Sequence, residues 1–359
     1  MLKSNRKLTT VLLLATALAL LAFNIQNAKS LEVQDTSNIV FDKETNTVYL
    51  DSLTLKQKIG QMFITWAEED NKEELQKMLI GGIYVNAKPS KEDFITTIDN
   101  FQEGTTIPFF VATDMEGGCS NPFEYFQDFP DLVAIGTKEE AYRVGHEQGK
   151  LLKEVGFNLN FAPVVELEDT IWYCRNFKGT PEEISQKASA YITGIQENVL
   201  ATAKHYPGKT LVYKDPHRYT GYAYITQDDL IPFEGSIQND VSAVMISHVI
   251  TRGAIDSEGK PAIASKRAVT SLRNQFNGLI ITDDTRMAAL QNHYSSSTEI
   301  YLDLFKADND LILYFNKDTK ELYYIISNIE KAIQYGAISE DRIDKSVTRI
   351  LKAKGIKVK

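Results

Sequence analysis

Ionisable side chains recur directly after short apolar segments along this 359-residue chain. Five such segments end in, or are soon followed by, carboxylate, imidazole or cationic groups, namely Asp114, Glu166 with Arg175, Lys204 with His205, His248, and Asp283 with Asp284. A single Asp after a strand is ordinarily a turn residue or a helix cap. Five segments that end this way require another explanation, because a charge beside apolar segments is costly unless it is paired or functional.

The combination of carboxylates, imidazoles and cations suits hydrolysis of a glycosidic bond. In that reaction one carboxylate attacks or stabilises the anomeric carbon, and a second group protonates the leaving oxygen. A metal site fits less well. His205, His217 and His248 could converge, but neither a His-Glu-x-x-His pattern nor paired cysteine spacing accompanies them. We therefore expect no catalytic metal and no cofactor.

Parallel β-strands would position these side chains. Eight apolar, strand-like segments alternate with longer amphipathic segments, over residues 61–64, 82–85, 108–113, 159–165, 201–205, 243–248, 279–282 and 311–315. This alternation is typical of βα units and a parallel sheet. Helices are predicted to begin after Thr137, Thr180 and Asp318, because each is followed three residues later by Glu.

Eight strands with intervening helices, over about 310 residues, match a single (β/α)8 TIM-type barrel of the α/β class with insertions. A doubly wound sheet is the alternative. In a barrel, the carboxyl ends of the strands form the mouth of the active site, which is where the ionisable residues fall. Because side chains alternate along a strand, we expect Asp283 but not Asp284 to face that mouth.

Composition and charge exclude several classes of protein. The chain is 43% hydrophobic and 24% charged, as in soluble globular proteins, and unlike a membrane bundle or a disordered chain. Its formal net charge of -9 argues against nucleic-acid binding, which requires clustered Lys and Arg. Cys119 and Cys174 are the only cysteines; they could form one disulfide or remain free thiols.

The first thirty residues have the layout of a secretory signal. Three basic residues precede an apolar run over residues 8–23, and the small residues Ala28 and Ser30 follow. The run is shorter than the roughly 20 residues that span a bilayer. We expect export to the periplasm, the cell envelope or the exterior. An uncleaved N-terminal anchor is the alternative, and it would be the only contact with a membrane.

Several motifs in a fixed order carry a resemblance to a known family. They are Asp-Met-Glu-Gly-Gly at 114–118, Asn-Phe-Ala-Pro-Val-Val at 160–165, Arg-Asn-Phe at 175–177, Lys-His-Tyr-Pro-Gly at 204–208 with Asp215 and His217 beyond it, and Ile-Thr-Asp-Asp at 281–284. From Leu53 to Leu351 the chain resembles glycoside hydrolase family 3, specifically its single-domain bacterial β-N-acetylglucosaminidases. The pair Asp215 and His217 is typical of that hexosaminidase branch.

The resemblance implies a catalytic (β/α)8 domain over residues 31–359, after a signal or anchor over residues 1–30. It implies a retaining β-N-acetylhexosaminidase with Asp283 as nucleophile and His217 as general acid/base, oriented by Asp215. The terminal sugar would be bound by five residues: Asp114, Arg175, Lys204, His205 and His248. The implied partner is a glycan with β-linked amino sugars, and we expect a monomer.

The sequence departs from the family pattern at a few positions. Cys119 stands where the family usually has Arg after Glu-Gly-Gly, Glu166 replaces an Asp, and Pro216 separates Asp215 from His217. These differences bear on the substrate more than on the reaction. Two alternatives remain: another family 3 glycosidase or phosphorylase, and a sugar-binding barrel without catalysis.

Overall fold

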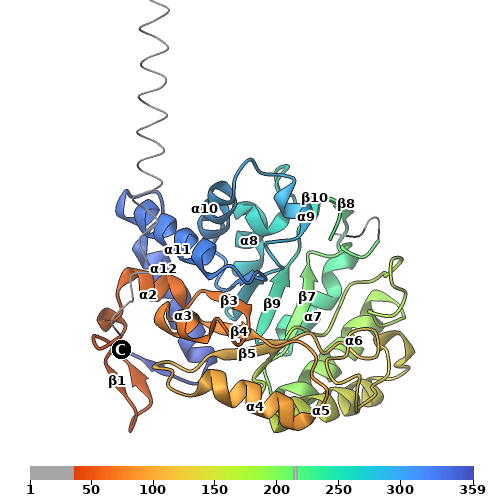
Figure 1. The fold of residues 1–359 in the computed structure, drawn as a ribbon. Helices are drawn as coiled ribbons and strands as arrows, with labels where there is room; N and C mark the ends of the chain where they lie inside the picture. The colour runs from red at the N-terminus through yellow and green to blue at the C-terminus, as the bar shows by residue number, and fades with distance from the viewer. Residues whose placement is uncertain (1–35, 213–214, 216) are drawn as a thin grey trace, which may run out of the picture. The chain divides into compact units, whose positions relative to one another are not determined.

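The computed structural model describes residues 36–212, 215 and 217–359 (Figure 1). The signal or anchor expected over residues 1–30 lies outside the described residues, as does Pro216. Within the described part of the chain, the helices are all too short or too polar to cross a membrane.

Two parallel sheets form the centre of the fold. The larger has the order β12-β3-β4-β5-β6 and the smaller the order β11-β9-β7. Their strands are β3 (Phe63–Trp66), β4 (Gly82–Tyr84), β5 (Phe110–Thr113), β6 (Leu159–Asn160), β7 (Thr202–Tyr206), β9 (Ala243–Ile246), β11 (Leu279–Thr282) and β12 (Ile312–Tyr314). Each of the eight predicted strands is present, with ends that differ by a few residues, except that β6 is much shorter.

Isolated parallel bridges connect the two sheets at both of their edges. Leu159 pairs with Leu200 and Val164 with Lys204 between β6 and β7, and Ile281 pairs with Leu311 between β11 and β12. The predicted α/β class with parallel strands is confirmed. The strands form two ladders with bridges between them, rather than one continuous closed sheet.

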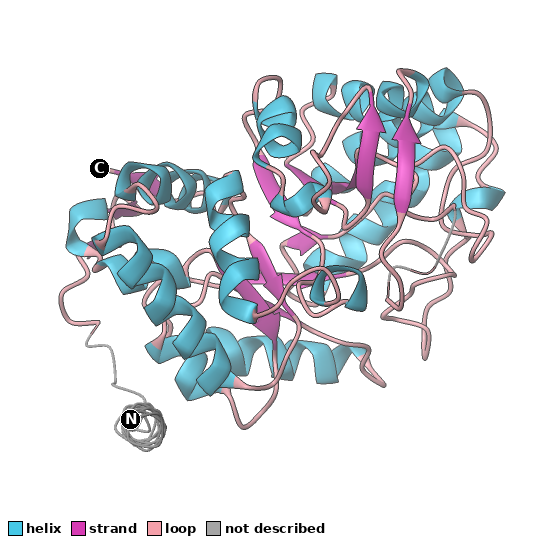
Figure 2. Cartoon of the chain, turned by 90° about the horizontal axis from the view of Figure 1, so that it is seen from above, coloured by secondary structure: helices cyan, strands magenta, loops and turns pink. Residues whose placement is uncertain are grey.

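Helices surround the strands (Figure 2). They are α2 (Leu55–Gly60), α3 (Lys72–Lys77), α4 (Lys91–Gln102), α5 (Lys138–Glu154), α6 (Pro181–Gln196), α7 (Ile231–Gln238), α8 (Lys266–Arg273), α9 (Ala288–Gln291), α10 (Ser297–Ala307), α11 (Thr319–Gln334) and α12 (Glu340–Ala353), with 3₁₀ helices η1 (Leu50–Ser52), η2 (Leu132–Ala134), η3 (Asp228–Leu230) and η4 (Ala262–Ala264).

The three predicted helix starts are confirmed. Thr180 forms a full capping box with Glu183, in which each side chain bonds the other residue's backbone N–H. Thr137 and Asp318 also cap their helices by accepting from amides of the first turn. At Thr137 the carboxylate of Glu140 binds the amide of Gly136 instead of that of the cap.

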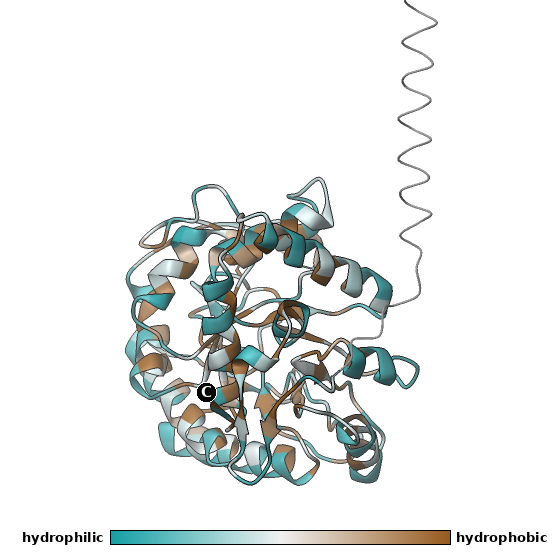
Figure 3. Ribbon diagram, turned by 90° about the vertical axis from the view of Figure 1, so that its left-hand side faces the viewer, coloured by the Kyte–Doolittle hydropathy of each residue, from teal (hydrophilic) through white to brown (hydrophobic). Residues whose placement is uncertain are grey.

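The core lies between the strands and the inner faces of the helices. All residues of β5, β7, β9, β11 and β12 are buried. In α11 the buried residues recur with helical spacing, at Leu322, Ile325, Ile326, Ile329 and Ile333. Figure 3 shows the same pattern, with hydrophobic residues on the strands and hydrophilic residues on the outer surfaces of many helices.

Five further strands were not predicted from the sequence. β8 (Tyr222–Ile225) pairs in parallel with β10 (Ile250–Gly253) to form a separate two-stranded sheet. β1 (Phe41–Asp42), β2 (Thr47–Val48) and β13 (Lys357–Val358) form a small sheet of order β1-β2-β13. β8 follows the segment that contains Asp215 and His217.

Candidate active site

A cavity of about 440 Å³ lies at the carboxyl ends of the eight central strands. Each of these strands, or the loop after it, contributes to its walls, which consist of Trp66, Tyr84, Asn86, Asp114, Glu116, Cys119, Ser120, Trp172, Arg175, Lys204, His205, Thr210, Leu211, His217, Met245, Asp283, Asp284, Met287, Leu313 and Phe315. The barrel prediction placed the active site at these strand ends, and the cavity lies there.

One side of the cavity is an ion-pair network centred on Glu116. The guanidinium of Arg175 donates to both carboxylate oxygens of Glu116, at 2.7 Å each. Lys204 Nζ lies 2.5 Å from Glu116 Oε1 and 2.5 Å from Asp114 Oδ1. Burial disfavours the charge of Glu116, but the two cations outweigh burial and hold its pKa well below the usual range. Glu116, Arg175 and Lys204 are therefore all charged at neutral pH.

His205 extends this wall. Its Nδ1 lies 2.8 Å from Oε1 of Glu166, and Oε2 of Glu166 accepts from the backbone N–H of Thr210 at 2.5 Å. Glu166 is buried. The carboxylate therefore fixes the orientation of the imidazole and also ties the loop after β7 to the strand end.

Asp283 follows β11 directly and lines the cavity. Its backbone N–H donates to Ile246 O on β9 at 3.0 Å. Burial by itself raises the pKa of Asp283, but neighbouring imidazole and cationic groups, with the amide of Asp284, outweigh burial and lower the pKa. Asp283 is therefore ionised at neutral pH, as a carboxylate nucleophile must be.

Asp284 also lines the cavity, which corrects the expectation that only Asp283 would face it. The two residues differ in their hydrogen bonds. Oδ1 of Asp284 accepts from the backbone N–H groups of Arg286 and Phe315, at 3.1 Å each. Burial raises the pKa of Asp284 to about 7. The strand has already ended at Thr282, so the alternation of a β-strand no longer applies here.

His248 is buried behind the nucleophile candidate and is not among the cavity-lining residues. Its Nε2 lies 2.9 Å from the carbonyl oxygen of Asp284 and 4.0 Å from Oδ2 of Asp283. Burial lowers the pKa of His248, and the charge of Asp283 opposes this shift. His248 therefore contacts the segment that holds Asp283.

His217 and Asp215 form a hydrogen-bonded pair on the loop after β7. Nδ1 of His217 lies 2.7 Å from Oδ1 of Asp215, which also accepts the backbone N–H of His217 at 2.9 Å. Burial raises the pKa of Asp215, but its hydrogen bonds with His217 lower it further than burial raises it. His217 lines the cavity although 61% of its side chain is exposed, and its ring contacts the ring of Trp172 edge-on, with centroids 6.1 Å apart.

Most of the residues predicted from the sequence therefore lie together. Asp114, Arg175, Lys204, His205, His217 and Asp283 line one cavity. Asp215 does not line the cavity but is hydrogen-bonded to His217, which does. His248 likewise lies beside Asp283 without lining the cavity itself. Glu116 was not predicted as a site residue, although it stands two residues after Asp114 in the same motif.

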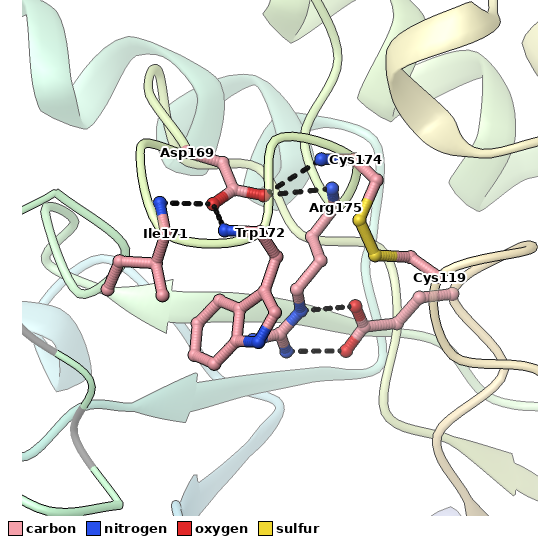
Figure 4. The surroundings of a disulfide bond; sticks show 7 residues. Cys119, Asp169, Ile171, Trp172, Cys174 and Arg175 are labelled. Atoms are coloured by element: carbon pink, nitrogen blue, oxygen red, sulfur yellow. Dashed lines mark hydrogen bonds and ion pairs between the residues drawn. A yellow bond between two sulfur atoms is a disulfide. The ribbon is translucent and has the colours of Figure 1, made fainter.

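A disulfide joins Cys119 to Cys174, which answers the question left open by the sequence (Figure 4). The bond links the loop after β5 to the loop after β6. In the second loop, Asp169 accepts hydrogen bonds from the backbone N–H groups of Ile171, Trp172, Cys174 and Arg175. Within the described residues, the one group with spacing suited to a metal is Cys119, Asp131 and Cys174, and the disulfide occupies both of its sulfur atoms.

Similar proteins are found over nearly the whole described chain. β-Hexosaminidase LpqI of Mycobacterium tuberculosis is 26% identical over 328 residues, which cover 84% of this chain and 83% of that protein. The structure of a glycoside hydrolase family 3 β-N-acetylglucosaminidase from a Paenibacillus species is 27% identical, with a TM-score of 0.78 over 84% of this chain. This chain spans only 62% of that longer protein.

A family 3 glycosyl hydrolase from Mycobacterium smegmatis shares the fold at 24% identity, with a TM-score of 0.77 over 85% of this chain and 98% of that one. The sequence profile described as "Glycosyl hydrolase family 3 N terminal domain" matches residues 54–353. That range contains the cavity and every residue that lines it. The chain therefore belongs to glycosyl hydrolase family 3 and is a glycoside hydrolase.

Proposed function

We propose that this chain is a retaining β-N-acetylhexosaminidase that releases terminal β-linked N-acetylglucosamine-type sugars. The observation that carries the proposal is that Asp283 and His217 line the same cavity. A carboxylate and a proton donor on one cavity are what retaining hydrolysis of a glycoside requires. The relatives named as β-hexosaminidases support the choice of sugar.

In the first step, a carboxylate oxygen of Asp283 attacks the anomeric carbon while Nε2 of His217 gives its proton to the departing glycosidic oxygen. The C–O bond to the leaving group breaks, and an ester bond to Asp283 forms. In the second step, neutral His217 takes a proton from water, which attacks the anomeric carbon and releases Asp283. Two inversions give net retention. Asp215 stabilises the protonated imidazole through Nδ1.

Four residues would bind the terminal sugar in this scheme, namely Asp114, Arg175, Lys204 and His205. Asp114 offers an acceptor for sugar hydroxyls, and Lys204 and Arg175 offer donors. Hydrogen bonds to charged groups are stronger and more directional than neutral ones. Glu116 already holds Arg175 and Lys204, Lys204 holds Asp114, and Glu166 holds His205, so these side chains require little reorganisation when substrate binds.

We further infer that the eight central strands form a (β/α)8 barrel and that residues 31–359 are one catalytic domain. The bridges between β6 and β7 and between β11 and β12 support closure of the two sheets. A cavity built from all eight strand ends is also expected of a barrel. The basic and apolar N-terminal segment supports export to the periplasm, the cell envelope or the exterior.

The proposal is tested by turnover of chromogenic β-N-acetylglucosaminide, β-N-acetylgalactosaminide and β-glucoside by the wild type, Asp283→Asn and Asp215→Asn. We expect the first substrate to be preferred. Asp283→Asn should abolish turnover, because an amide does not form the glycosyl ester. Asp215→Asn should lower kcat roughly 100-fold, with little change in KM, because the imidazolium loses its partner.

Asp341→Asn is the matched control, because Asp341 is an exposed residue of α12 that pairs with Lys345. It should keep wild-type kcat and KM. Proton NMR of the first product should show the β-anomer. An α-anomer as first product, or full turnover by Asp283→Asn, would refute the mechanism. A rate that requires inorganic phosphate would indicate a phosphorylase.

A further inference from the structure

The only two cysteines of the chain cross-link two loops of the cavity wall. Cys119 follows β5 and lines the cavity, and Cys174 lies in the loop after β6, next to Arg175. They are 55 residues apart in sequence.

The loop that contains Cys174 also presents two side chains to the cavity. The guanidinium of Arg175 binds Glu116 on the other loop, and the indole of Trp172 lies 5.0 Å from that guanidinium. The same indole contacts His217, the proposed acid/base, through a ring pair. Trp172 therefore contacts both Arg175 of the ion-pair network and the proposed proton donor. Figure 4 shows its indole beside the guanidinium of Arg175.

The two linked loops differ in how firmly they are held. Gly117 has φ +130°, and a Cβ there would lie 2.4 Å from Pro130 O, so the chain beside Cys119 is packed against another backbone segment. The loop around Cys174 has no helix or strand, and Tyr173 has φ +62° with 67% of its side chain exposed. It is held by hydrogen bonds from its backbone N–H groups to Asp169, by backbone bonds to Val133 and Leu211, by the Arg175–Glu116 pair and by the disulfide.

We propose that the Cys119–Cys174 disulfide is a positioning element of the sugar pocket. It holds the loop with Trp172 and Arg175 against the loop after β5. Cleaving it lowers the affinity for substrate and leaves the chemical step largely intact. This inference rests on the proposed function. Dithiothreitol supplies the two electrons and two protons that convert the bond to two thiols, and is itself oxidised to a cyclic disulfide. An exported protein would keep the bond, because disulfides persist outside the cytoplasm.

The test measures kcat and KM for the β-N-acetylglucosaminide with oxidised and dithiothreitol-reduced wild type and with the double variant Cys119→Ser/Cys174→Ser. Because the chain has no other cysteine, the reductant can act only at this bond. We expect KM to rise about tenfold on reduction and kcat to stay within about twofold. The double variant should behave like the reduced wild type and should not respond to dithiothreitol.

A purely structural role would give another result, since reduction would then lower the active fraction, and kcat would fall while KM stayed constant. That outcome overturns the inference, as does unchanged kinetics. A double-mutant cycle with Arg175→Lys adds a second readout, because the effect of cleavage on KM should be smaller when Arg175 is already replaced. Equal effects in both backgrounds would show that the bond does not act through Arg175.

The same samples separate this inference from the proposed function. If oxidised wild type does not cleave the N-acetylglucosaminide, the proposed function fails. Calorimetric binding of N-acetylglucosamine to oxidised and reduced protein then decides the inference. Weaker binding after reduction supports it. Equal binding, or no binding to either form, overturns it.

Discussion

The buried charges of this site are stabilised by ion pairs with one another, whereas a single exposed charge would be stabilised by water. Glu116 shares its carboxylate between Arg175 and Lys204, and Lys204 also binds Asp114. Removing one member of a buried pair leaves an uncompensated charge, which typically costs 3–5 kcal/mol. The network therefore holds its donors in one arrangement, and Glu116 positions the cations that we propose to bind the sugar.

Asp284 makes stability depend on pH through burial of its carboxyl group. The pKa in the folded protein is about 7, against a usual value of 3.8. Between these values the folded carboxyl keeps a proton that the unfolded chain releases, so stability falls as pH rises from about 4 to about 7. Asp284→Asn removes this penalty while keeping an oxygen for the amides of Arg286 and Phe315.

We therefore expect Asp284→Asn to be more stable than the wild type at pH 8 by about 2 kcal/mol, a value that allows for solvent screening at this partly exposed group. At pH 4.5 the difference should be about a quarter of that, roughly 0.5 kcal/mol, because most of this penalty develops above that pH. Urea denaturation of both proteins at the two pH values measures it. The surface variant Asp341→Asn should show no such dependence, and an equal difference at both pH values for Asp284→Asn would exclude burial of this carboxyl as the cause.

Helices α5 and α6 pack with their backbones close together, because both have glycine at the contact. A Cβ on Gly194 of α6 would lie 2.2 Å from Tyr142 O of α5, and one on Gly145 of α5 would lie 2.4 Å from Tyr191 O of α6. Ala normally favours a helix over Gly by about 1 kcal/mol. Here the helices would have to separate, and overpacking of this kind costs about 1–3 kcal/mol.

Gly194→Ala should consequently lower Tm by about 2–4 °C, against the direction that helix propensity predicts. Differential scanning calorimetry measures the change. The neighbouring Thr193 is exposed on the same helix, so Thr193→Ala should leave Tm unchanged or raise it. A higher Tm for Gly194→Ala would mean that the two helices do not touch in solution as described.

The sequence located the central strands because apolar segments alternate with capped helices, and both signals are local. It overestimated β6, because Pro163 has no N–H to pair with a neighbouring strand. It missed β8, whose partner β10 follows a different central strand. Most residues of the cavity wall could be predicted because they follow strand ends, and the carboxyl ends of parallel strands lie on the same side of the sheet. The burial of His248 and the contacts of Glu116 depend on side-chain packing, which spacing does not determine.

The two ends of the described chain meet in the sheet β1-β2-β13. At least three backbone bonds tie residues 357–359 to residues 46–50: Lys357 N donates to Asn46 O, Lys359 N to Val48 O, and Leu50 N to Lys359 O. At about 1 kcal/mol each, their loss should cost about 3 kcal/mol.

Deleting residues 357–359 should therefore lower Tm by several degrees, as measured by calorimetry. The deletion should leave kcat and KM unchanged, because the cavity is lined by other segments. Lys357→Ala keeps all three bonds and should match the wild type. If it lost as much stability as the deletion, side-chain contacts rather than strand pairing would hold the ends together.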